Sequence, residues 1–373
     1  MDFADLFCGA GGLSFGFKLK KHRLVLAIDN DKYAIETLKY NFKDSQKKIL
    51  NIKIEDYLKN ENLNNLKLDL VIGGPPCQGY STANRQNIIN DPRNKLYKYF
   101  VKFISITKPK YILIENVVGI KKKAKDIIDA FAKINYYVDF RILQASDYQI
   151  PQKRKRVFFF GVYKKDKTFR EKVVNFFNFL NKKSKKTFVL KDALYGLPRI
   201  HPKTIKNDRS NENNLSGYNI LKIKKLKKNQ YIDLINNKKK IEFIYNHKAR
   251  YNNSRDIEIF NRLPQGQNST HESIKDIMPY KSRANIFKDK YFKLHEDKFC
   301  KTITSHMKFD CNMYIHPNQA RGLSPRESAR VQSFPDYYFF CGPPSKCYMQ
   351  IGNAVPPLLS REICKAIEKI DKL

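Results

Sequence analysis

The chain has 373 residues, which is enough for a large hydrophobic core and for one large domain or two unequal ones. Lys and Arg total 72 against 36 Asp and Glu, and the net charge of +36 indicates either a polyanionic partner, nucleic acid first, or a lysine-rich coding bias. Seven dispersed cysteines without a C-x-x-C pair argue against a disulfide framework or zinc ribbon, and interrupted apolar runs with no signal-peptide pattern predict a cytoplasmic protein without membrane spans.

In the first half of the chain, short β-rich runs alternate with amphipathic stretches, which is the pattern of βαβ units. Strands are expected at residues 2–7, 23–29, 68–73, 110–115 and 156–162. This alternation predicts an α/β fold with a doubly wound, mostly parallel sheet. In such a sheet the loops at the carboxyl ends of the strands face one crevice, where ligands bind.

The composition changes between residues 163 and 298, where lysine runs and Asn-rich stretches replace the βαβ rhythm. We expect a first domain at residues 1–163, completed by 345–373, and a smaller inserted domain at 164–344. A flexible basic linker is the alternative, although residues 241–245 and 257–260 keep enough apolar side chains for some packing.

A glycine-rich segment, DLFCGAGG at residues 5–12, follows the first expected strand and opens a helix. Glycines at these places permit a tight turn and a close approach of the backbone to a nucleotide-like cofactor. Asp29 ends the second strand and can accept hydrogen bonds from both hydroxyls of a ribose. Together these features predict a site for a dinucleotide or for S-adenosylmethionine, without choosing between them.

Three further segments carry candidate chemistry. GGPPCQGYS at residues 73–81 holds Cys77 in a rigid turn, which suits a nucleophile better than a core residue. Glu115 ends an apolar strand, where burial would raise its pKa and make it a proton donor, or where it pairs with a lysine. Arg154 and Arg156 share one side of an extended segment and could bind a carbonyl oxygen and a phosphate, or form a solvated basic turn.

In this order the segments resemble the cytosine-C5 DNA methyltransferase family, whose pattern is a Phe-x-Gly-x-Gly-Gly loop, a Pro-Cys loop, Glu-Asn-Val and Gln-x-Arg-x-Arg. Residues 321–336 and 350–357 are similar to the late motifs of that family. The resemblance covers most of residues 1–163 and 300–373. Each motif alone is weak, but their shared order makes coincidence remote.

The resemblance implies a fold of the S-adenosylmethionine-dependent methyltransferase type and a covalent mechanism. Cys77 would add to C6 of a cytosine flipped out of the duplex, and Glu115 would hold or protonate N3. Arg156 would bind O2 of the base, and Arg154 would support the site or a nearby phosphate. Gln78 and Ser81 would contact the DNA backbone. The methyl donor would leave as S-adenosylhomocysteine, and no metal is expected.

The resemblance also assigns a cofactor pocket that needs both ends of the chain, so the helix after Pro357 should pack on the first domain. Asn30 departs from the family, which often has an aromatic residue there to stack on the adenine, and Gln144 and Gln149 replace its usual Asn and Gly. The expected cofactor-binding residues are Phe7, Gly9, Gly11, Asp29, Asp56, Tyr57, Pro76, Leu96, Asn353 and Ala354.

The family reads its target sequence with the region corresponding here to residues 163–316, which makes the inserted domain a target-recognition domain. Most polar residues there are expected at the surface or on phosphates. Double-stranded DNA is the implied partner, a restriction endonuclease encoded nearby is a further one, and the chain is expected to be a cytoplasmic monomer that joins the nucleoid when bound to DNA. Side chains of types able to read base edges are Arg250, Arg255, Arg262, Gln265, Gln267 and Asn268.

Other functions compete with this interpretation. A catalytically inactive DNA-binding relative has little need for Cys77, Glu115, Arg154 and Arg156 together. A tRNA cytosine-C5 methyltransferase would carry its own signature in the middle segment, which we do not find. An NAD-linked oxidoreductase explains the glycine loop and Asp29 but leaves the Pro-Pro-Cys-Gln segment and the late motifs unexplained.

Overall fold

The structure is a computed structural model that describes residues 1–76, 96–181, 183–206, 215–279 and 290–373. The chain folds into two compact units. The sheet unit comprises Met1–Tyr148, Lys155–Lys185 and Ala354–Leu373, and the inserted unit comprises Gln149–Arg154 and Lys186–Asn353. The units are described separately below.

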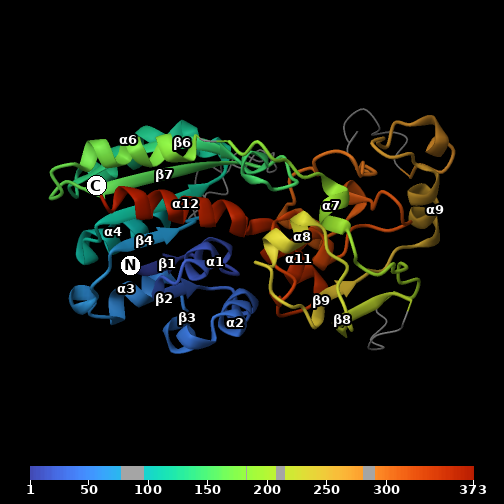
Figure 1. The fold of residues 1–373 in the computed structure, drawn as a ribbon, viewed down its shortest axis with the longest axis horizontal. Coiled ribbons are helices and arrows are strands. Elements are labelled where there is room, and N and C mark those ends of the chain that lie inside the picture. The colour runs from blue at the N-terminus through green and yellow to red at the C-terminus, as the bar shows by residue number, and fades with distance from the viewer. Residues whose placement is uncertain (77–95, 182, 207–214, 280–289) are drawn as a thin grey trace. The chain divides into compact units, whose positions relative to one another are not determined.

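A seven-stranded sheet forms the centre of the sheet unit, with the order β3-β2-β1-β4-β5-β7-β6 (Figure 1). All neighbouring pairs are parallel except those of β7, which runs antiparallel to both β5 and β6. Its strands are β1 (Asp2–Leu6), β2 (Arg23–Asp29), β3 (Ile49–Asn51), β4 (Leu70–Gly73), β5 (Tyr111–Asn116), β6 (Tyr136–Gln144) and β7 (Lys155–Tyr163).

The predicted doubly wound, mostly parallel sheet is confirmed, and each of the five expected strands lies within two residues of its predicted bounds. β3 and β6 were not predicted. The chain leaves β1 toward β2 on one side and returns to β4 on the other. The carboxyl ends of β1 and β4 therefore flank a topological switch point, the usual place for a ligand in this class of fold.

Helices cover the sheet because the strands carry continuous apolar runs and are buried on both faces. The main core cluster joins side chains of β1, β2, β4, β5, β6 and β7 to α3, α4 and α5. The helices of this unit are α1 (Gly12–Leu19), α2 (Lys32–Asn41), α3 (Ile54–Asn60), α4 (Leu96–Thr107), α5 (Ala124–Ala132), α6 (Phe169–Leu180) and α12 (Pro357–Ile370).

The carboxyl-terminal helix α12 packs on α1, as the sequence predicted. The contact is close: a Cβ atom on Gly16 would lie 2.3 Å from Ser360 Oγ and 2.5 Å from the backbone nitrogen of Arg361. Ser360 Oγ also donates a hydrogen bond to the carbonyl of Leu13. Glycine is thus required at position 16 for the two helix backbones to approach, and α12 fixes the helix that follows the glycine-rich loop.

The boundaries between the units differ from those predicted. Helix α6 belongs to the sheet unit, since the ring of Phe176 stacks on Phe160 of β7 at a centroid distance of 3.9 Å. The main stretch of the inserted unit therefore begins at Lys186 rather than at residue 164, and a short earlier segment, Gln149–Arg154, also belongs to this unit. It ends at Asn353 rather than at 344, because α11 packs against a 3-10 helix, Ser305–Lys308, of the same unit.

The inserted unit combines a two-stranded antiparallel sheet with short helices (Figure 1). Around α9 an apolar cluster of Ile259, Phe260, Leu263 and neighbours is fully buried, so the described part of this unit is packed rather than a flexible linker. Its elements are α7 (Leu190–Leu194), β8 (Gly217–Lys222), α8 (Gln230–Ile235), β9 (Phe243–Lys248), α9 (Ser254–Arg262), α10 (Pro325–Val331) and α11 (Pro344–Asn353).

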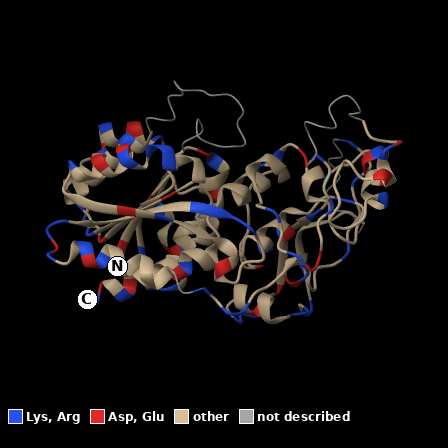
Figure 2. Cartoon of the chain, turned by 90° about the horizontal axis from the view of Figure 1, so that it is seen from above, with Lys and Arg blue, Asp and Glu red and all other residues tan. Residues whose placement is uncertain are grey.

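Lys and Arg residues are spread along the backbone of both units (Figure 2). The excess of positive charge is therefore not confined to the middle segment. Within the described ranges, no helix combines the length and the apolar character that crossing a bilayer requires.

Candidate active site

The glycine-rich loop connects β1 to α1 through three residues with positive φ, namely Phe7 at 60°, Gly9 at 52° and Gly11 at 76°. Two of these are glycines, which adopt such angles without strain. Phe7 adopts one as a bulky residue, which is a costly conformation typical of functional sites. Gly11 is the N-cap of α1, so the backbone amides of the first helical turn have no partner within the helix.

Asp29 at the end of β2 fastens this loop. Its Oδ2 accepts a hydrogen bond from the backbone amide of Gly9 at 2.8 Å, and its Oδ1 accepts one from Asp31 at 2.8 Å. Burial raises the pKa of Asp29, and these backbone donors oppose the rise. A carboxylate has about four lone-pair positions, so both oxygens retain acceptor capacity for a ribose.

The end of β3 contributes residues that sequence reasoning missed. Asn51 donates from Nδ2 to the carbonyl of Asp29 at 3.1 Å, and the amide of Ile52 donates to the same carbonyl at 3.1 Å. Asp56 and Tyr57, expected at the adenine, lie instead on α3, where Tyr57 is 7% exposed and joins the core. Burial raises the pKa of its hydroxyl. Sequence reasoning missed these residues because β3 has only three residues, which is too short for a strand to be recognised from its sequence.

The loop after β4 leads toward the predicted nucleophile. Asn116 at the end of β5 holds it, because Asn116 Nδ2 donates to the carbonyl of Pro75 at 2.9 Å while Oδ1 accepts from the amide of Val117 at 2.9 Å. Pro76 is the last described residue of this loop. Cys77, Gln78 and Ser81 lie outside the described residues.

Glu115 and Arg156 form an ion pair beside this loop, with Arg156 Nε 3.0 Å from Glu115 Oε1. Their side chains are 12% and 17% exposed, respectively. The pair forms because β7 runs antiparallel to β5, which brings the first residues of β7 to the edge where β5 ends. A Cβ atom on Gly74 would lie 3.4 Å from Glu115 Oε2, so the start of the loop after β4 passes directly along the carboxylate. Burial lowers the pKa of Arg156, and the Glu115 carboxylate opposes that shift.

Arg154 occupies a different environment from Arg156. It belongs to the inserted unit, is 1% exposed, and donates from Nη1 to the carbonyl of Ile303 at 2.8 Å and from Nη2 to that of Gly352 at 3.0 Å. A side chain so enclosed does not fit the predicted contact with a phosphate. Its placement fits the supporting role, since it joins two distant segments of the inserted unit.

The remaining predicted cofactor residues lie at element ends. Leu96 is the first residue of α4 and packs on the main core cluster of the sheet unit. Ala354 is buried in the sheet unit, whereas Asn353 is exposed at the end of α11 in the inserted unit. The structure thus brings Phe7, Gly9, Gly11, Asp29, Pro76, Glu115 and Arg156 to one edge of the sheet, where the four parallel strands β1, β2, β4 and β5 end.

The family described as C-5 cytosine-specific DNA methylase matches residues 1–369 of this chain. The chain belongs to the C-5 cytosine-specific DNA methylase family. It is 32% identical to the type II methyltransferase M.DdeI of Desulfomicrobium norvegicum, over 98% of this chain and 88% of that protein. It is 30% identical to the type II methyltransferase M1.HphI of Haemophilus parahaemolyticus, over 100% of this chain and 87% of that protein.

A solved structure agrees with this membership. The putative DNA modification methyltransferase encoded within an E. coli prophage is similar with a TM-score of 0.74 and 26% sequence identity, over 100% of both chains. This C-5 cytosine-specific DNA methylase is therefore an enzyme with the fold of S-adenosylmethionine-dependent methyltransferases. The family resemblance stated from the motifs is confirmed.

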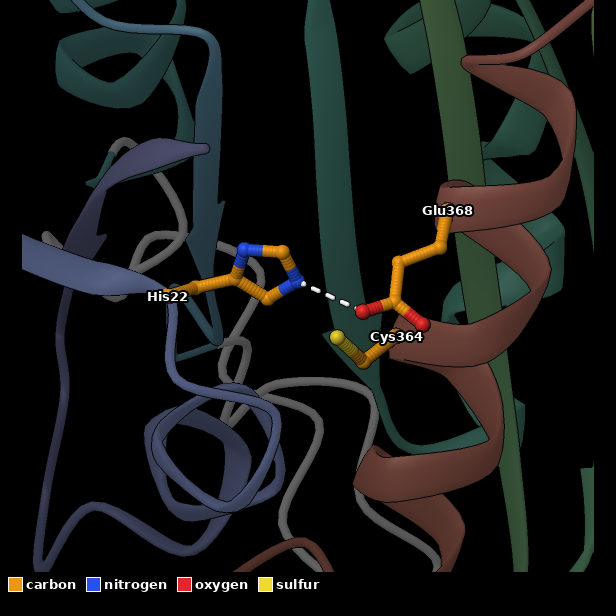
Figure 3. A group of neighbouring side chains, drawn as sticks. All are labelled: His22, Cys364 and Glu368. Atoms are coloured by element: carbon orange, nitrogen blue, oxygen red, sulfur yellow. Dashed lines mark hydrogen bonds and ion pairs between the residues drawn. The ribbon is translucent and has the colours of Figure 1, made fainter.

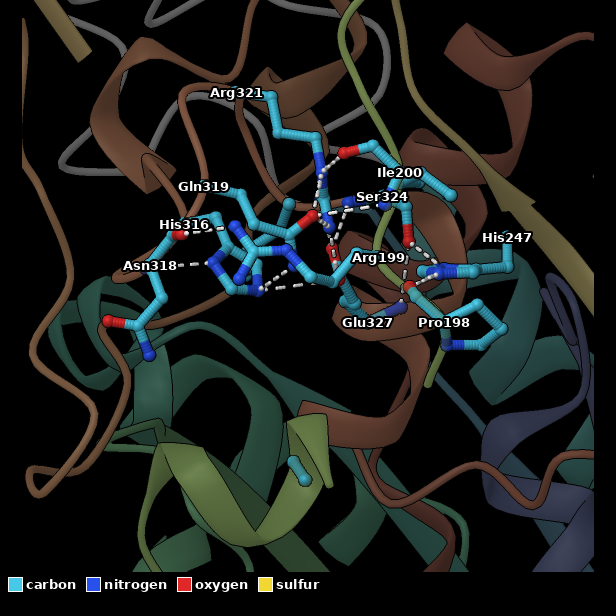
Figure 4. A network of polar contacts seen from close by, with 12 residues as sticks. Pro198, Arg199, Ile200, His247, His316, Asn318, Gln319, Arg321, Ser324 and Glu327 are labelled. Atoms are coloured by element: carbon cyan, nitrogen blue, oxygen red, sulfur yellow. Dashed lines mark hydrogen bonds and ion pairs between the residues drawn. The ribbon is translucent and has the colours of Figure 1, made fainter. Parts of the chain in front are cut away.

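One late motif of the methylase, residues 321–336, forms a buried network in the inserted unit (Figure 4). Arg321 pairs with Glu327 through two hydrogen bonds of 2.7 Å, and Ser324 caps α10 by accepting from the amide of Glu327. His247 Nδ1 lies 3.0 Å from Ser324 Oγ. The two arginine hydrogen bonds and the enclosed cap indicate that this motif stabilises the unit and does not face a substrate.

The residues of types able to read base edges fall into two groups, those with hydrogen-bond or ion-pair partners inside the unit and those that are exposed. Arg250 donates to the carbonyls of Met307 and Phe309, and Arg262 pairs with Glu258 and Asp276. Gln265 Nε2 donates to Asn318, and Asn268 Oδ1 accepts from Thr270. Arg255 and Gln267 are exposed. Internal partners occupy the first four, which leaves Arg255 and Gln267 as the better candidates for contact with DNA.

A cluster of potential metal ligands, His22, Cys364 and Glu368, lies away from this edge (Figure 3). Its side chains already have partners: His22 Nε2 is 3.1 Å from Glu368 Oε1, and Lys20 Nζ is 3.2 Å from Glu368 Oε2. Burial raises the pKa of the Cys364 thiol to about 12. Lys20 supplies the positive charge that a bound cation would bring. The contacts of His22 and Lys20 with Glu368 link α12 to the turn before β2. The absence of a metal stays a prediction.

Proposed function

We propose that this protein is a sequence-specific DNA (cytosine-5-)-methyltransferase that acts through a covalent Cys77 adduct. The observation that carries the proposal is the Glu115–Arg156 pair beside Gly74 and Pro75, at the sheet edge that also holds the glycine-rich loop. A carboxylate and a guanidinium at the mouth of a nucleophile loop match a cytosine, which offers an amine donor, a ring nitrogen and a carbonyl oxygen.

S-adenosylmethionine fits the residues of the glycine-rich loop. The carboxylate of Asp29 offers acceptors to a ribose. Because Asn51 and Ile52 tie the end of β3 to the Asp29 carbonyl, we assign the adenine to this end of β3 and not to the buried ring of Tyr57. Among the ion pairs of the described residues, none involves Asp5 or Asp29, so no basic side chain there would compete with a cationic ligand for these two groups. The cofactor supplies an electrophilic methyl group on a sulfonium.

The protein's own residues would prepare cytosine for that methyl group. The Cys77 thiolate adds to C6, and the electron pair of the C5–C6 double bond makes C5 nucleophilic while Glu115 holds the proton at N3. Arg156 binds O2, where negative charge develops. After C5 has taken the methyl group, loss of the C5 proton to solvent restores the double bond and expels the thiolate. Asn116 fixes the loop that presents the thiol.

The target base must leave the duplex for this chemistry, at a cost of a few kcal/mol that pocket and backbone contacts recover. We assign sequence recognition to the inserted unit, with the modification of DNA in a restriction-modification system as the biological setting. The support is the similarity of about 30% to two type II methyltransferases. The net charge of +36 favours binding to the phosphate backbone.

Transfer of a labelled methyl group to mixed-sequence duplex DNA tests the proposal, followed by mapping of 5-methylcytosine at single-base resolution. We expect methylation in one short shared sequence, its loss in Cys77→Ala, and retention in Cys341→Ala, a control at a partly exposed cysteine of the inserted unit. The proposal would be contradicted if folded protein that binds the cofactor transferred no methyl group to DNA. If the protein instead methylated tRNA in a parallel assay, tRNA and not DNA would be its substrate.

A duplex containing 5-fluorocytosine tests the covalent step itself. Fluorine cannot leave C5 as a proton does, so the enzyme should remain attached to DNA after methyl transfer. We expect a denaturation-resistant complex with the wild-type protein and with Cys341→Ala. A complex that still forms with Cys77→Ala would show that another residue is the nucleophile.

A further inference from the structure

Asp5 is a buried carboxyl group that the proposed chemistry does not use. It lies on β1 and is 1% exposed, and Ser14 Oγ donates a hydrogen bond to its Oδ2 at 2.5 Å. Ser14 lies in the first helical turn of α1 and is itself fully buried. The two residues bracket the glycine-rich loop, so Asp5 lies immediately beneath the segment that receives the cofactor.

The surroundings of Asp5 contain no positive charge among the described residues. α1 contributes the hydroxyl of Ser14, the loop contributes Cys8, and β2 contributes the carboxylate of Asp29. β4, the other neighbouring strand, is apolar throughout its length, Leu70–Gly73. An acidic pair without a cation partner is unexpected in a chain with a net charge of +36.

We propose that Asp5 makes the cofactor site discriminate by charge between the cationic methyl donor and its neutral product. This inference rests on the proposed use of S-adenosylmethionine. The sulfonium of the donor carries a positive charge that the thioether of S-adenosylhomocysteine lacks, while the rest of the two molecules is the same. A carboxylate in a low-dielectric interior attracts that charge more strongly than it would in water.

The discrimination depends on pH. Burial, with a smaller contribution from Asp29, raises the pKa of Asp5 to about 7, and the Ser14 hydrogen bond opposes the rise. Below this pH the group is neutral and the two ligands are treated alike. Above it the group is ionised and the donor is favoured, by on the order of 10-fold for an interaction of one charge pair across a few ångströms of protein. Reciprocally, donor binding promotes loss of the Asp5 proton.

Calorimetric titration of the protein with each ligand between pH 5.5 and 7.5, at constant ionic strength, tests this inference. We expect the ratio of the Kd for S-adenosylhomocysteine to the Kd for S-adenosylmethionine to rise about 6-fold over this range in the wild type, because Asp5 is not yet fully ionised at pH 7.5. The ratio should be independent of pH in Asp5→Asn. The matched control is Asp2→Asn, on the same strand, whose carboxylate pairs with Arg23 and should leave the rise intact.

A wild-type ratio that does not change with pH, although both ligands bind, would overturn the role of Asp5. Failure of S-adenosylmethionine to bind at any pH would instead overturn the proposed function. If Asp5→Asn does not fold, the wild type still decides through proton release at pH 7, measured in two buffers of different ionisation enthalpy. Donor binding should release a fraction of a proton and product binding none, and equal release by both ligands would contradict the inference.

Discussion

The ion pair of Glu115 and Arg156 concentrates opposite charges at a place that is mostly shielded from water. Each partner would be expensive to leave alone, because a charge that is largely buried depends on its counterion. A base that entered this site would find a fixed acceptor and a fixed donor whose positions are set by two paired strands. The pair would therefore orient a bound base as well as supply charges to it.

Replacement of Glu115 by Gln should separate these contributions. The amide keeps the size of the side chain and a hydrogen-bonding oxygen but loses the charge and the ability to hold the N3 proton. We expect kcat to fall about 10²- to 10⁴-fold. Circular dichroism should show a folded protein. Asp139→Asn is the control, since Asp139 pairs with Arg141 on β6, the edge strand beyond β7, and it should retain wild-type activity in the methyl-transfer assay.

Asn116 carries a second prediction at this scale. Asn116→Ala leaves the carbonyl of Pro75 without its donor and frees the loop that precedes Cys77. We expect about 10- to 100-fold slower trapping on 5-fluorocytosine DNA, with the Kd for cofactor unchanged. Asn41→Ala, which removes a hydrogen bond within α2, should trap at the wild-type rate. A wild-type trapping rate in Asn116→Ala would show that the loop does not need this hydrogen bond.

At the scale of elements, the contact between α1 and α12 carries the third prediction. Gly16→Ala inserts a Cβ atom 2.3 Å from Ser360 Oγ and 2.5 Å from a backbone nitrogen, and helix backbone cannot yield as a flexible side chain would. We expect the free energy of unfolding to fall by about 1–3 kcal/mol. Urea denaturation followed by circular dichroism measures it. Lys365→Ala on α12, which loses only a surface ion pair with Glu362, should change it by less than about 1 kcal/mol.

The sequence predicted those elements whose pattern is strong and local. Apolar runs such as the one ending at Glu115 identified five strands, and the loops at their ends identified the sheet edge. β3 was missed because three residues carry no periodicity, and with it the contacts of Asn51 and Ile52 to Asp29. β6 was missed because its exposure pattern mixes buried and exposed positions and it pairs only with β7.

The two arginines show why spacing alone did not define the site. Arg154 and Arg156 are two residues apart, which predicted a shared side of an extended segment. β7 begins at Lys155, between them, and Arg154 folds into the inserted unit onto the carbonyls of Ile303 and Gly352. Those partners are some 150 to 200 residues away in the sequence, and no local sequence pattern predicts them.

At the scale of the whole molecule, two buried histidines predict how stability depends on pH. Burial lowers the pKa of His247 and of His316 to about 4, and the Arg321 guanidinium adds to the shift in both. The unfolded chain takes up protons near pH 6.5, whereas the folded chain takes them up only near pH 4. Stability is therefore fully present above pH 6.5 and is lost as the pH falls toward 4.

We expect a loss of about 3 kcal/mol for each histidine over this interval. Urea denaturation at pH 7, 6, 5 and 4 measures it, followed by circular dichroism because the chain has no Trp. His247→Asn should have a shallower decline than the wild type. His201→Gln, at an exposed position of the same unit, should decline in parallel with the wild type. Equal slopes in all three proteins would contradict the assignment.

The charge of +36 predicts the dependence of DNA binding on salt. Binding to non-specific duplex should weaken by about 10³-fold or more between 50 and 200 mM salt, because counterions are released from the phosphates. Replacing Lys238, Lys239 and Lys240 by Ala should reduce the slope of log K against log salt by about 1–3, as measured by fluorescence anisotropy. Ala at Lys164, Lys165 and Lys167, which follow the end of β7 opposite the site edge, should leave the slope unchanged.

The packing of α12 on α1 has a consequence for how the protein is made. The ribosome makes the glycine-rich loop and α1 before it makes the inserted unit, whereas α12, the helix that packs on α1, comes only with residues 357–370. Between the two, the entire inserted unit is synthesised. A contact with so large a separation in sequence forms slowly and late. Helix α1 therefore gains its packing partner α12 only after the inserted unit has been synthesised, so the order of synthesis makes this part of the sheet unit late to form.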